Sequence, residues 1–514
     1  MSAAYAGAAE QDVFAGAREQ AEVMEKHLRS PESMRNTHTE LEEFIEKEGR
    51  EYQRRLLQAH FEIRAERERP VEVKGSDGID RMHRRRSVRA LLSVVGEVEV
   101  ERMAYQATDV PGLHPMDAVL NLPDELYSHS VRRRCAEEAA SCSFDEVVER
   151  LRKSTGASVP KRQVEELAER AARDFDKFYA ARAVQVEDTQ ALLVLSFDGK
   201  GIAMRHEDLR PATKKAAEAG RHKLKKRLSK GEKRNRKRMT QVATIYTVDP
   251  WVRSPLDIVN DLRPVHDVAA PRPRPVNKRV WASVEKPPKE VISAAFEEGL
   301  RRDPERRRHW VVLVDGNKEQ LTQIKSAAKK AGVKITIVLD IIHVLEYLWE
   351  AAYCFYDDGT KEAEQWVTCR LQELLEGCTA GDIARTIRRH AASRTLDDKA
   401  LVILDDCISY LVNYRTLLHY DRALAAGLPI ATGVIEGACR YLVKDRMDRT
   451  GARWSLRGAE AVLCLRSLRA SGDFDAYWEF HLQQEYVRTH RARYAGGKVP
   501  SPLPPQRPML RRVK

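Results

Sequence analysis

Apolar residues recur every three or four positions from residue 32 to residue 69, which predicts one long amphipathic helix. A helix of that length serves either as an arm or dimer element, or it packs onto its own domain. Residues 1–30 are rich in alanine and charge and show no firm periodicity, so no element is expected there. Residues 1–70 are therefore expected to form an N-terminal helical arm.

Between residues 87 and 106 the pattern changes to two short apolar runs, which predicts a β-hairpin. Gly96 and Glu97 are the expected turn, because glycine suits the tight loop of a hairpin. The basic run 83–86 precedes this hairpin. A hairpin in this position either rests on a nucleic-acid backbone or is part of the scaffold.

A cluster of helices is predicted between residues 128 and 172. Ser143 followed by Glu146 is typical of a capped helix start. After a short turn that contains glycine, a second helix should begin with Lys161 and Arg162 in its first turn. This arrangement suits a helix-turn-helix, whose second helix enters the major groove of DNA. Two packed helices in any all-α domain would give the same pattern.

Beyond residue 187, strands alternate with helices. The expected strands are 191–195, 241–248, 279–284, 310–314 and 334–339, and the expected helices between them are 288–300 and 318–331. Strands that are apolar throughout are buried on both faces, so a mixed sheet covered by helices is predicted. Residues 343–426 have an almost wholly helical pattern, which resumes near Glu436 and continues to residue 485. The last twenty residues are rich in proline and arginine and are expected to be disordered.

The composition narrows the classes of protein that these elements can build. The 514 residues include 89 Lys and Arg against 77 Asp and Glu, a net charge of +12, which favours a polyanionic partner where the charge is clustered. No apolar run of about 18 residues and no secretory start are found, so we expect no membrane contact and a cytoplasmic location. The eight cysteines occur singly, which argues against a zinc ribbon or a redox motif and for buried free thiols.

Three acidic residues follow apolar segments where the predicted sheet should meet the surface. Asp198 and Asp315 each come after a strand and before a glycine, and Glu436 lies at the start of a helix. Carboxylates placed in this way can converge on a pair of divalent cations, and hard oxygen ligands suit Mg²⁺ or Mn²⁺. Two such metals about 3.5–4 Å apart activate a water or a 3′-hydroxyl for attack on a phosphodiester. Taken singly, each Asp-Gly pair is also an ordinary turn.

Asp340 and His343 form a second candidate group after the last predicted strand. Residues three apart share one face of a helix, so this pair can bind a metal or brace the floor of the site. Asp340 also ends an apolar strand and is therefore the rival of Asp315 for the second carboxylate. The structural alternative is that Asp340 caps a helix and His343 is a satisfied core residue.

Basic residues cluster in three places where they can contact phosphate groups. The candidates for DNA contact are Lys161 and Arg162 in the helix-turn-helix, Lys225, Lys226, Arg227, Arg234, Arg236, Lys237 and Arg238 in the basic block 221–238, and Lys444, Arg446, Arg453 and Trp454 after the last acid. Such cations position DNA without reading its sequence, although a solvated charged run is the alternative. Trp454 either stacks on a displaced base or packs in the core. Arg440, four residues after Glu436, forms an intrahelical ion pair with it in the simplest case.

The stretch from residue 41 to residue 494 resembles bacterial DDE transposases of the ISKra4 insertion-sequence family. The motifs that carry the resemblance are SFDGKG at 196–201, VDGN at 314–317, DIIHVLEYLW at 340–349, PIATGVIEG at 429–437, KDRMD at 444–448 and TGARW at 450–454. The resemblance implies an RNase H-like catalytic core, split by a helical insertion before its last carboxylate. It supports Asp198, Asp315 and Glu436 as the catalytic and metal-binding triad, with Asp340 and His343 as supporting or alternative residues. Asp315 is preferred to Asp340 on topology, because the second acid of the core should end the first strand after the helix.

The same resemblance implies binding of terminal inverted repeats and strand transfer into target DNA. Expected partners are transposon ends, target DNA and further copies of the chain, as at least a dimer, in a bacterial cytoplasm near the nucleoid. Mg²⁺ or Mn²⁺ is the expected cofactor. Two other functions remain open, namely a catalytically silent, transposase-derived DNA-binding regulator and a structure-selective nuclease on the same fold.

The expected domain organisation combines these elements. It consists of a helical arm at 1–70, a β-hairpin region at 71–127, a helix-turn-helix-like DNA-binding region at 128–186, an RNase H-like core at 187–343 and 431–485, a helical insertion at 344–430 and a basic, proline-rich tail at 486–514. The fold class is thus multidomain α+β or α/β, with an all-α insertion and a mixed sheet flanked by helices.

Overall fold

The computed structural model describes residues 12–184, 186–187, 189–219, 236–262, 272–449 and 451–504. Contacts between residues divide the chain into two compact units. The first comprises Met1–Ala180 and Asp475–Lys514, and the second comprises Ala181–Phe474. In the described part of the chain, no helix is both long and apolar enough to cross a membrane.

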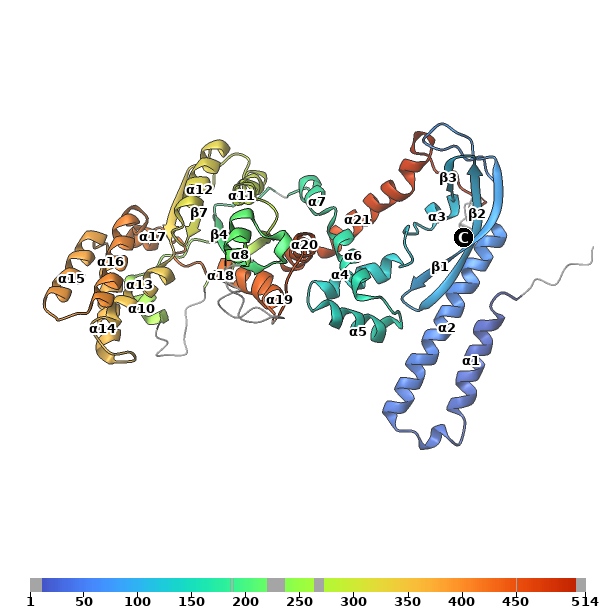
Figure 1. Cartoon of the computed structure of the whole chain (residues 1–514), viewed down its shortest axis with the longest axis horizontal. Coiled ribbons are helices and arrows are strands. Elements are labelled where there is room, and N and C mark those ends of the chain that lie inside the picture. Colours follow the sequence, from blue (N-terminus) through green and yellow to red (C-terminus); the bar gives the residue numbers. More distant parts are fainter. Residues whose placement is uncertain are drawn as a thin grey trace, which may run out of the picture. The chain divides into compact units, whose positions relative to one another are not determined.

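Two helices, α1 (Ala15–Leu28) and α2 (His38–Arg67), lie side by side at the start of the first unit (Figure 1). Helix α2 begins where Thr37 and Glu40 form a reciprocal capping box. Its Phe61 is buried among strand residues of the neighbouring sheet. The long predicted helix therefore packs onto its own domain, and α1 occupies a segment for which no element was expected.

The three-stranded sheet of the first unit has the order β1 (His83–Ser93), β2 (Gly96–Ala107) and β3 (Val110–Leu113), all antiparallel. The predicted hairpin is present, but its turn lies at residues 94–95 instead of Gly96 and Glu97, because Ser93 pairs with Gly96. The Ser93 hydroxyl accepts a hydrogen bond from Val95 N at 3.2 Å and donates one to Gly96 O at 2.7 Å. The Ser93 side chain thus stabilises a turn in which glycine had been expected to be the determining residue.

Helices make up the rest of the first unit. They are α3 (Pro115–Val119), α4 (His129–Ala139), α5 (Phe144–Thr155), α6 (Lys161–Ala172), α7 (Phe175–Ala181) and α21 (Phe474–Thr489). Ser143 and Glu146 form the expected capping box of α5, and Gly156 ends that helix in the left-handed region at φ 69°. Helices α4, α5 and α6 pack on one another. The two helices of the predicted helix-turn-helix are therefore present.

The C-terminal segment belongs to the first unit, whereas the sequence placed residues up to 485 in the core. Helix α21 runs to Thr489, and the Tyr477 hydroxyl donates to the carbonyl of Ala171. Further on, Tyr494 is buried beside Tyr105, and Arg69 N donates to Pro502 O at 2.7 Å. Contacts such as that of Tyr494 thus hold residues 486–504 on the first unit, whereas the last twenty residues, 495–514, were expected to be disordered.

The second unit is built on a five-stranded sheet of order β6-β5-β4-β7-β8. Its strands are β4 (Leu192–Ala203), β5 (Lys237–Val248), β6 (Val276–Ser283), β7 (Trp310–Val314) and β8 (Ile335–Leu339). Strands β6, β5 and β4 pair antiparallel with their neighbours, whereas β4, β7 and β8 pair parallel. The prediction of a mixed sheet flanked by helices is confirmed.

Helices surround this sheet and form the insertion. They are α8 (Pro211–Ala219), α10 (Pro255–Leu262), α11 (Pro288–Arg302), α12 (Lys318–Ala331), α13 (Ile341–Tyr353), α14 (Lys361–Leu375), α15 (Ala380–Ala392), α16 (Asp398–Asn413), α17 (Tyr420–Ala425), α18 (Gly433–Ala438), α19 (Asp445–Met447) and α20 (Leu456–Ser471). Helices α13 to α16 pack on one another as the predicted helical segment (Figure 1). A π-helical stretch, Cys439–Lys444, links α18 to α19.

Candidate functional site

Three acidic residues lie level with one another, one inside a strand of the second sheet and two just after the ends of the neighbouring strands. Ser196 pairs with Leu313 in the parallel ladder of β4 and β7, so Asp198 and Asp315, each two residues further on, share one level. In the same way, Val314 pairs with Leu339 in β7 and β8, which places Asp315 beside Asp340. Parallel strands lie about 4.8 Å apart, so the parallel ladder alone brings these three residues together.

Asp198 lies inside a strand, although the sequence suggested that it ends one. Strand β4 continues to Ala203 because it pairs with β5 over its whole length. The shorter strand β7 stops before Asp315, which leaves the Asp198 carboxylate half-buried at the step between long and short strands. Its Oδ1 accepts a hydrogen bond from Gly199 N at 2.5 Å.

The Asp198 carboxylate also contacts a cysteine that the sequence analysis did not single out. The thiol of Cys439 donates to Asp198 Oδ2 at 3.1 Å. Burial raises the pKa of Cys439, and the negative charge of Asp198 raises it further, so the thiol remains a protonated donor. Cys439 lies three residues after Glu436, and this spacing on one helix face was the signal that could have identified it.

Glu436 is an exposed residue of α18, the short helix that packs against β4 and β5. Glu436 precedes Cys439, which touches Asp198, by three residues, about one helical turn along the chain. Arg440 Nε lies 3.9 Å from Asp445 Oδ1. Arg440 therefore pairs with Asp445 and not, as in the simplest case, with Glu436. The Glu436 side chain has no hydrogen bond or ion pair with another described residue.

A pocket of about 410 Å³ opens beside the two aspartates. Asp198, Asp315, Arg210, Thr240 and Gln320 are among its lining residues. Glu436 is not among the described residues that line it, so the third acid of the predicted triad lies outside this pocket. Among the described residues, Thr240 Oγ1 and Gln320 Oε1 are buried and have no hydrogen-bond partner.

Asp340 performs a structural task that occupies both of its carboxylate oxygens. Only 2% of the residue is exposed. Oδ1 accepts hydrogen bonds from Ile342 N, which caps α13, and from Thr432 N at 3.2 Å, and Oδ2 accepts one from the Thr432 hydroxyl. Asp340 thereby ties the end of β8 to the segment that leads into α18.

His343 lies half-buried on α13, and its Nδ1 is 2.9 Å from Glu346 Oε2. Burial lowers the pKa of His343, but the hydrogen bond to Glu346 and the charges of Asp340 and Asp315 raise it overall. The structural alternative of a core histidine is therefore wrong for His343, which is partly exposed and paired with a neighbouring carboxylate.

The basic block predicted to bind phosphate lies mostly outside the described residues. This holds for Lys225, Lys226, Arg227 and Arg234. Arg236, Lys237 and Arg238 are described and half-buried. Arg238 Nε donates to Val284 O at 2.8 Å, so this side chain supports the end of the sheet.

Two further candidates for DNA contact are buried. Trp454 is 6% exposed, its Nε1 donates to Met447 O at 3.0 Å, and its main chain bonds to Ala203 and Arg205. Arg446 is 3% exposed and lies over the Trp454 ring at 4.7 Å. Stacking of Trp454 on a displaced base is therefore wrong for this conformation, because the ring is part of the core. Lys444 and Arg453 are exposed.

The basic residues at the start of α6 remain accessible. Lys161 Nζ lies 2.6 Å from Asp145 Oδ2, and Arg162 Nε lies 3.1 Å from Glu166 Oε1. Both lysine and arginine side chains are more than half exposed. Exposed pairs of this kind contribute at most about 1 kcal/mol, so a phosphate group can displace them at little cost.

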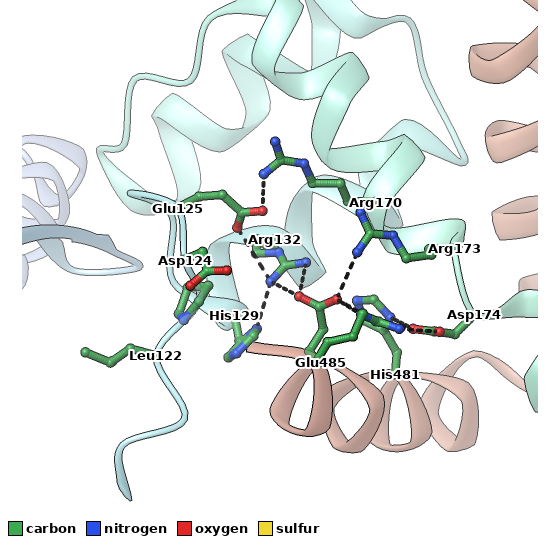
Figure 2. A network of polar contacts seen from close by, with 12 residues as sticks. Leu122, Asp124, Glu125, His129, Arg132, Arg170, Arg173, Asp174, His481 and Glu485 are labelled. Carbon is green, nitrogen blue, oxygen red and sulfur yellow. Dashed lines mark hydrogen bonds and ion pairs between the residues drawn. The ribbon is translucent and has the colours of Figure 1, made fainter. Parts of the chain in front are cut away.

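The first unit contains a buried polar network that the sequence did not reveal (Figure 2). Its centre is formed by Asp174, His481 and Glu485. Each of these side chains has one atom that could bind a metal, and these three atoms lie within 4.8 Å of one another, as in no other such group of the described residues. Figure 2 shows that His481 and Glu485 on α21 face Asp174 and Arg132. Arg488 donates to Asp174 at 2.8 and 2.7 Å, and Arg132 donates to Glu485 at 3.2 Å.

Arginines thus already occupy the carboxylate oxygens that a metal ion at this cluster would need. Two guanidinium groups so close would also repel a divalent cation. The arrangement fits a structural clamp between α21 and the helices α4 and α6 better than a metal centre.

Asp198, Asp315 and Glu436 are not as close together as the residues of that network. A single cation held at about 2 Å by each oxygen needs its ligands within about 4 Å of one another. Two cations about 3.5–4 Å apart accept a wider spacing. No family model matches the chain, and no curated protein matches it either.

Proposed function

We propose that this protein is a DNA transposase of the DDE type, similar to the ISKra4 insertion-sequence family, which cleaves and joins DNA strands with divalent cations. The observation that carries the proposal is the placement of Asp198 and Asp315 on adjacent parallel strands, level with each other at one pocket. The helix that bears Glu436 reaches the same place through the contact of Cys439 with Asp198. An RNase H-like core would have a mixed five-stranded sheet of this kind.

The donor set at this edge suits Mg²⁺ or Mn²⁺. Asp198 and Asp315 supply hard carboxylate oxygens, and neither forms an ion pair with another described residue. Asp340 is a poor rival, because both of its oxygens already accept hydrogen bonds. Bound at these residues, two cations would activate a water or a 3′-hydroxyl and stabilise the oxygen that leaves the phosphodiester. Glu436 would join them from an exposed position on α18.

DNA is the proposed substrate, both as transposon ends and as target. The exposed cations Lys161 and Arg162 lie in the first turn of the second helix of the helix-turn-helix, where they can contact phosphate groups. Lys444 and Arg453 are exposed in the segment that follows α18 along the chain. A transposase must hold two ends at once, so we propose that at least two copies act together.

The deciding experiment uses the purified full chain and duplexes that carry the DNA flanking its reading frame. Cleavage and strand joining are followed on sequencing gels with Mg²⁺ or Mn²⁺. Asp198→Asn, Asp315→Asn and Glu436→Gln should each reduce the rate about a thousandfold, since cation contacts stabilise the transition state by several kcal/mol. Binding of the same duplexes should change little.

Glu362→Gln, an exposed change on α14, is the matched control and should cut at the normal rate. A Glu436→Gln protein that cuts as fast as the control would contradict the triad. Sequence-specific binding without cleavage by the unaltered chain would favour the regulator. Cutting of branched DNA without joining would favour the nuclease.

A further inference from the structure

Tyrosines of the helical insertion donate their hydroxyls to main-chain carbonyls at the ends of β7 and β8, next to the acidic residues. The three pairs are Tyr410 with Asp315 O at 3.1 Å, Tyr414 with Gly316 O, and Tyr420 with Leu339 O at 3.0 Å. Tyr410 lies 95 residues from its partner along the chain, so only the tertiary fold brings them together.

The first two bonds hold the turn from which the Asp315 carboxylate projects. Within this turn, Asp315 Oδ1 accepts a hydrogen bond from Asn317 N at 3.0 Å. Gly316 has φ 100°, and a Cβ atom at this position would lie 3.2 Å from Cζ of Tyr414. The turn is therefore shaped on one side by its own backbone and on the other by the phenol ring of Tyr414.

The rings that carry these hydroxyls are themselves held. Tyr347 on α13 stacks on Tyr410 with ring centroids 4.0 Å apart and planes inclined by 17°. Tyr420 is fully buried on α17. Residues of α13 and α16 thus support the turn at Asp315, and Tyr420 on α17 supports the neighbouring end of β8.

We propose that Tyr410 and Tyr414 are positioning residues through which the helical insertion sets the Asp315 carboxylate for a divalent cation. This inference rests on the proposed function for its link to DNA cleavage, but cation binding tests it without cleavage. Partners that orient a metal ligand typically contribute 10–100-fold to metal affinity or activity. Loss of either hydroxyl should therefore weaken cation binding about tenfold while the ring packing remains.

The experiment measures Mn²⁺ binding to the full chain by electron paramagnetic resonance of the free ion. Tyr410→Phe and Tyr414→Phe each remove one hydroxyl and keep the ring. Tyr353→Phe, an exposed tyrosine on α13, is the matched control. Asp315→Asn shows which part of the Mn²⁺ binding belongs to the candidate site, because this variant should no longer bind Mn²⁺ there. The unfolding midpoint and duplex affinity of the phenylalanine variants should match those of the control.

A second readout separates positioning from general damage. If the hydroxyls set a metal ligand, cleavage by Tyr410→Phe should recover toward the normal rate as the Mn²⁺ concentration rises. A loss of rate that is the same at every Mn²⁺ concentration would overturn the inference, as would Mn²⁺ binding by both variants equal to that of Tyr353→Phe. Equal binding by the unaltered chain and Asp315→Asn would instead remove the metal site, and with it the proposed function.

Discussion

The buried network of Asp174 leads to a sharp prediction about the stability of the first unit. The Asp174 side chain is 1% exposed and accepts hydrogen bonds from His481 Nδ1 at 2.8 Å and from two nitrogens of Arg488. Burial by itself raises the pKa of Asp174, but its bonds to Arg488 and His481 lower that pKa well below the usual range. The carboxylate is therefore charged in the folded protein and depends on these partners.

Asp174→Asn keeps the shape of the side chain and removes its charge. Breaking a buried ion pair from one side costs about 3–5 kcal/mol, because the remaining charge is left uncompensated. Arg488 retains a bond to Glu485 at 2.6 Å, and 30% of its side chain is exposed. We therefore expect the lower end of that range, a loss of about 3 kcal/mol in the free energy of unfolding.

The assay is native-state hydrogen exchange, with peptides from α4, α6 and α21 reporting on the first unit and peptides from β4, β5 and β7 on the second. The two units need not unfold together, so a single global midpoint would not be sufficient. Asp124→Asn is the matched control, because Asp124 and Arg493 form an exposed pair at 3.7 Å that contributes at most about 1 kcal/mol.

The prediction is refuted if hydrogen exchange gives the same free energy of opening for the first unit in Asp174→Asn and in Asp124→Asn. Chelation gives a second check, since arginines and not a metal are expected to neutralise this network. Addition of EDTA should leave exchange of α21 unchanged in the unaltered chain. Faster exchange on chelation would show that a bound cation holds the cluster.

Two further predictions concern protonation and packing. Burial, helped by the charge of Arg132, lowers the pKa of His129 from 6.5 to about 4. Between pH 6.5 and about 4 the imidazole binds a proton in the unfolded chain but not in the folded one. The free energy of unfolding of the first unit should therefore fall by about 3 kcal/mol as the pH falls through this range. His129→Gln should reduce this pH dependence, as measured by hydrogen exchange. In the second unit, a Cβ atom on Gly299 would lie 2.3 Å from the ring of Trp310. Gly299→Ala should therefore destabilise that unit by about 1–3 kcal/mol in urea unfolding, whereas Gly16→Ala, which meets no atom within 4 Å, should not destabilise its helix.

Local sequence patterns determined which segments became helices and strands. All five strands of the second sheet contain the apolar runs that predicted them, because a strand buried on both faces needs an apolar stretch, although β4 and β5 extend beyond those runs. The capping box at Ser143 and Glu146 placed the start of α5, since its contacts span only three residues. These features depend on neighbours along the chain, which the sequence displays directly.

The placement of Asp198 and Asp315 side by side could be anticipated only in part, because both follow apolar runs but the continuation of β4 past Asp198 was not visible in the sequence. The burial of Trp454 could not, because an aromatic ring suits both a core and a stacking surface, and only its neighbours decide. The same holds for the turn after Ser93, which lies two residues before the expected position and contains two hydrogen bonds of the Ser93 hydroxyl.

Only the tertiary structure decided which distant groups support the candidate site. Tyr410 with Asp315, and Cys439 with Asp198, are separated by 95 and 241 residues along the chain. No periodicity links such partners, because their contact depends on how whole helices dock on the sheet. The sequence alone thus determined the elements and the acidic residues that follow their apolar runs, whereas long-range packing determined which side chains hold those acids in place.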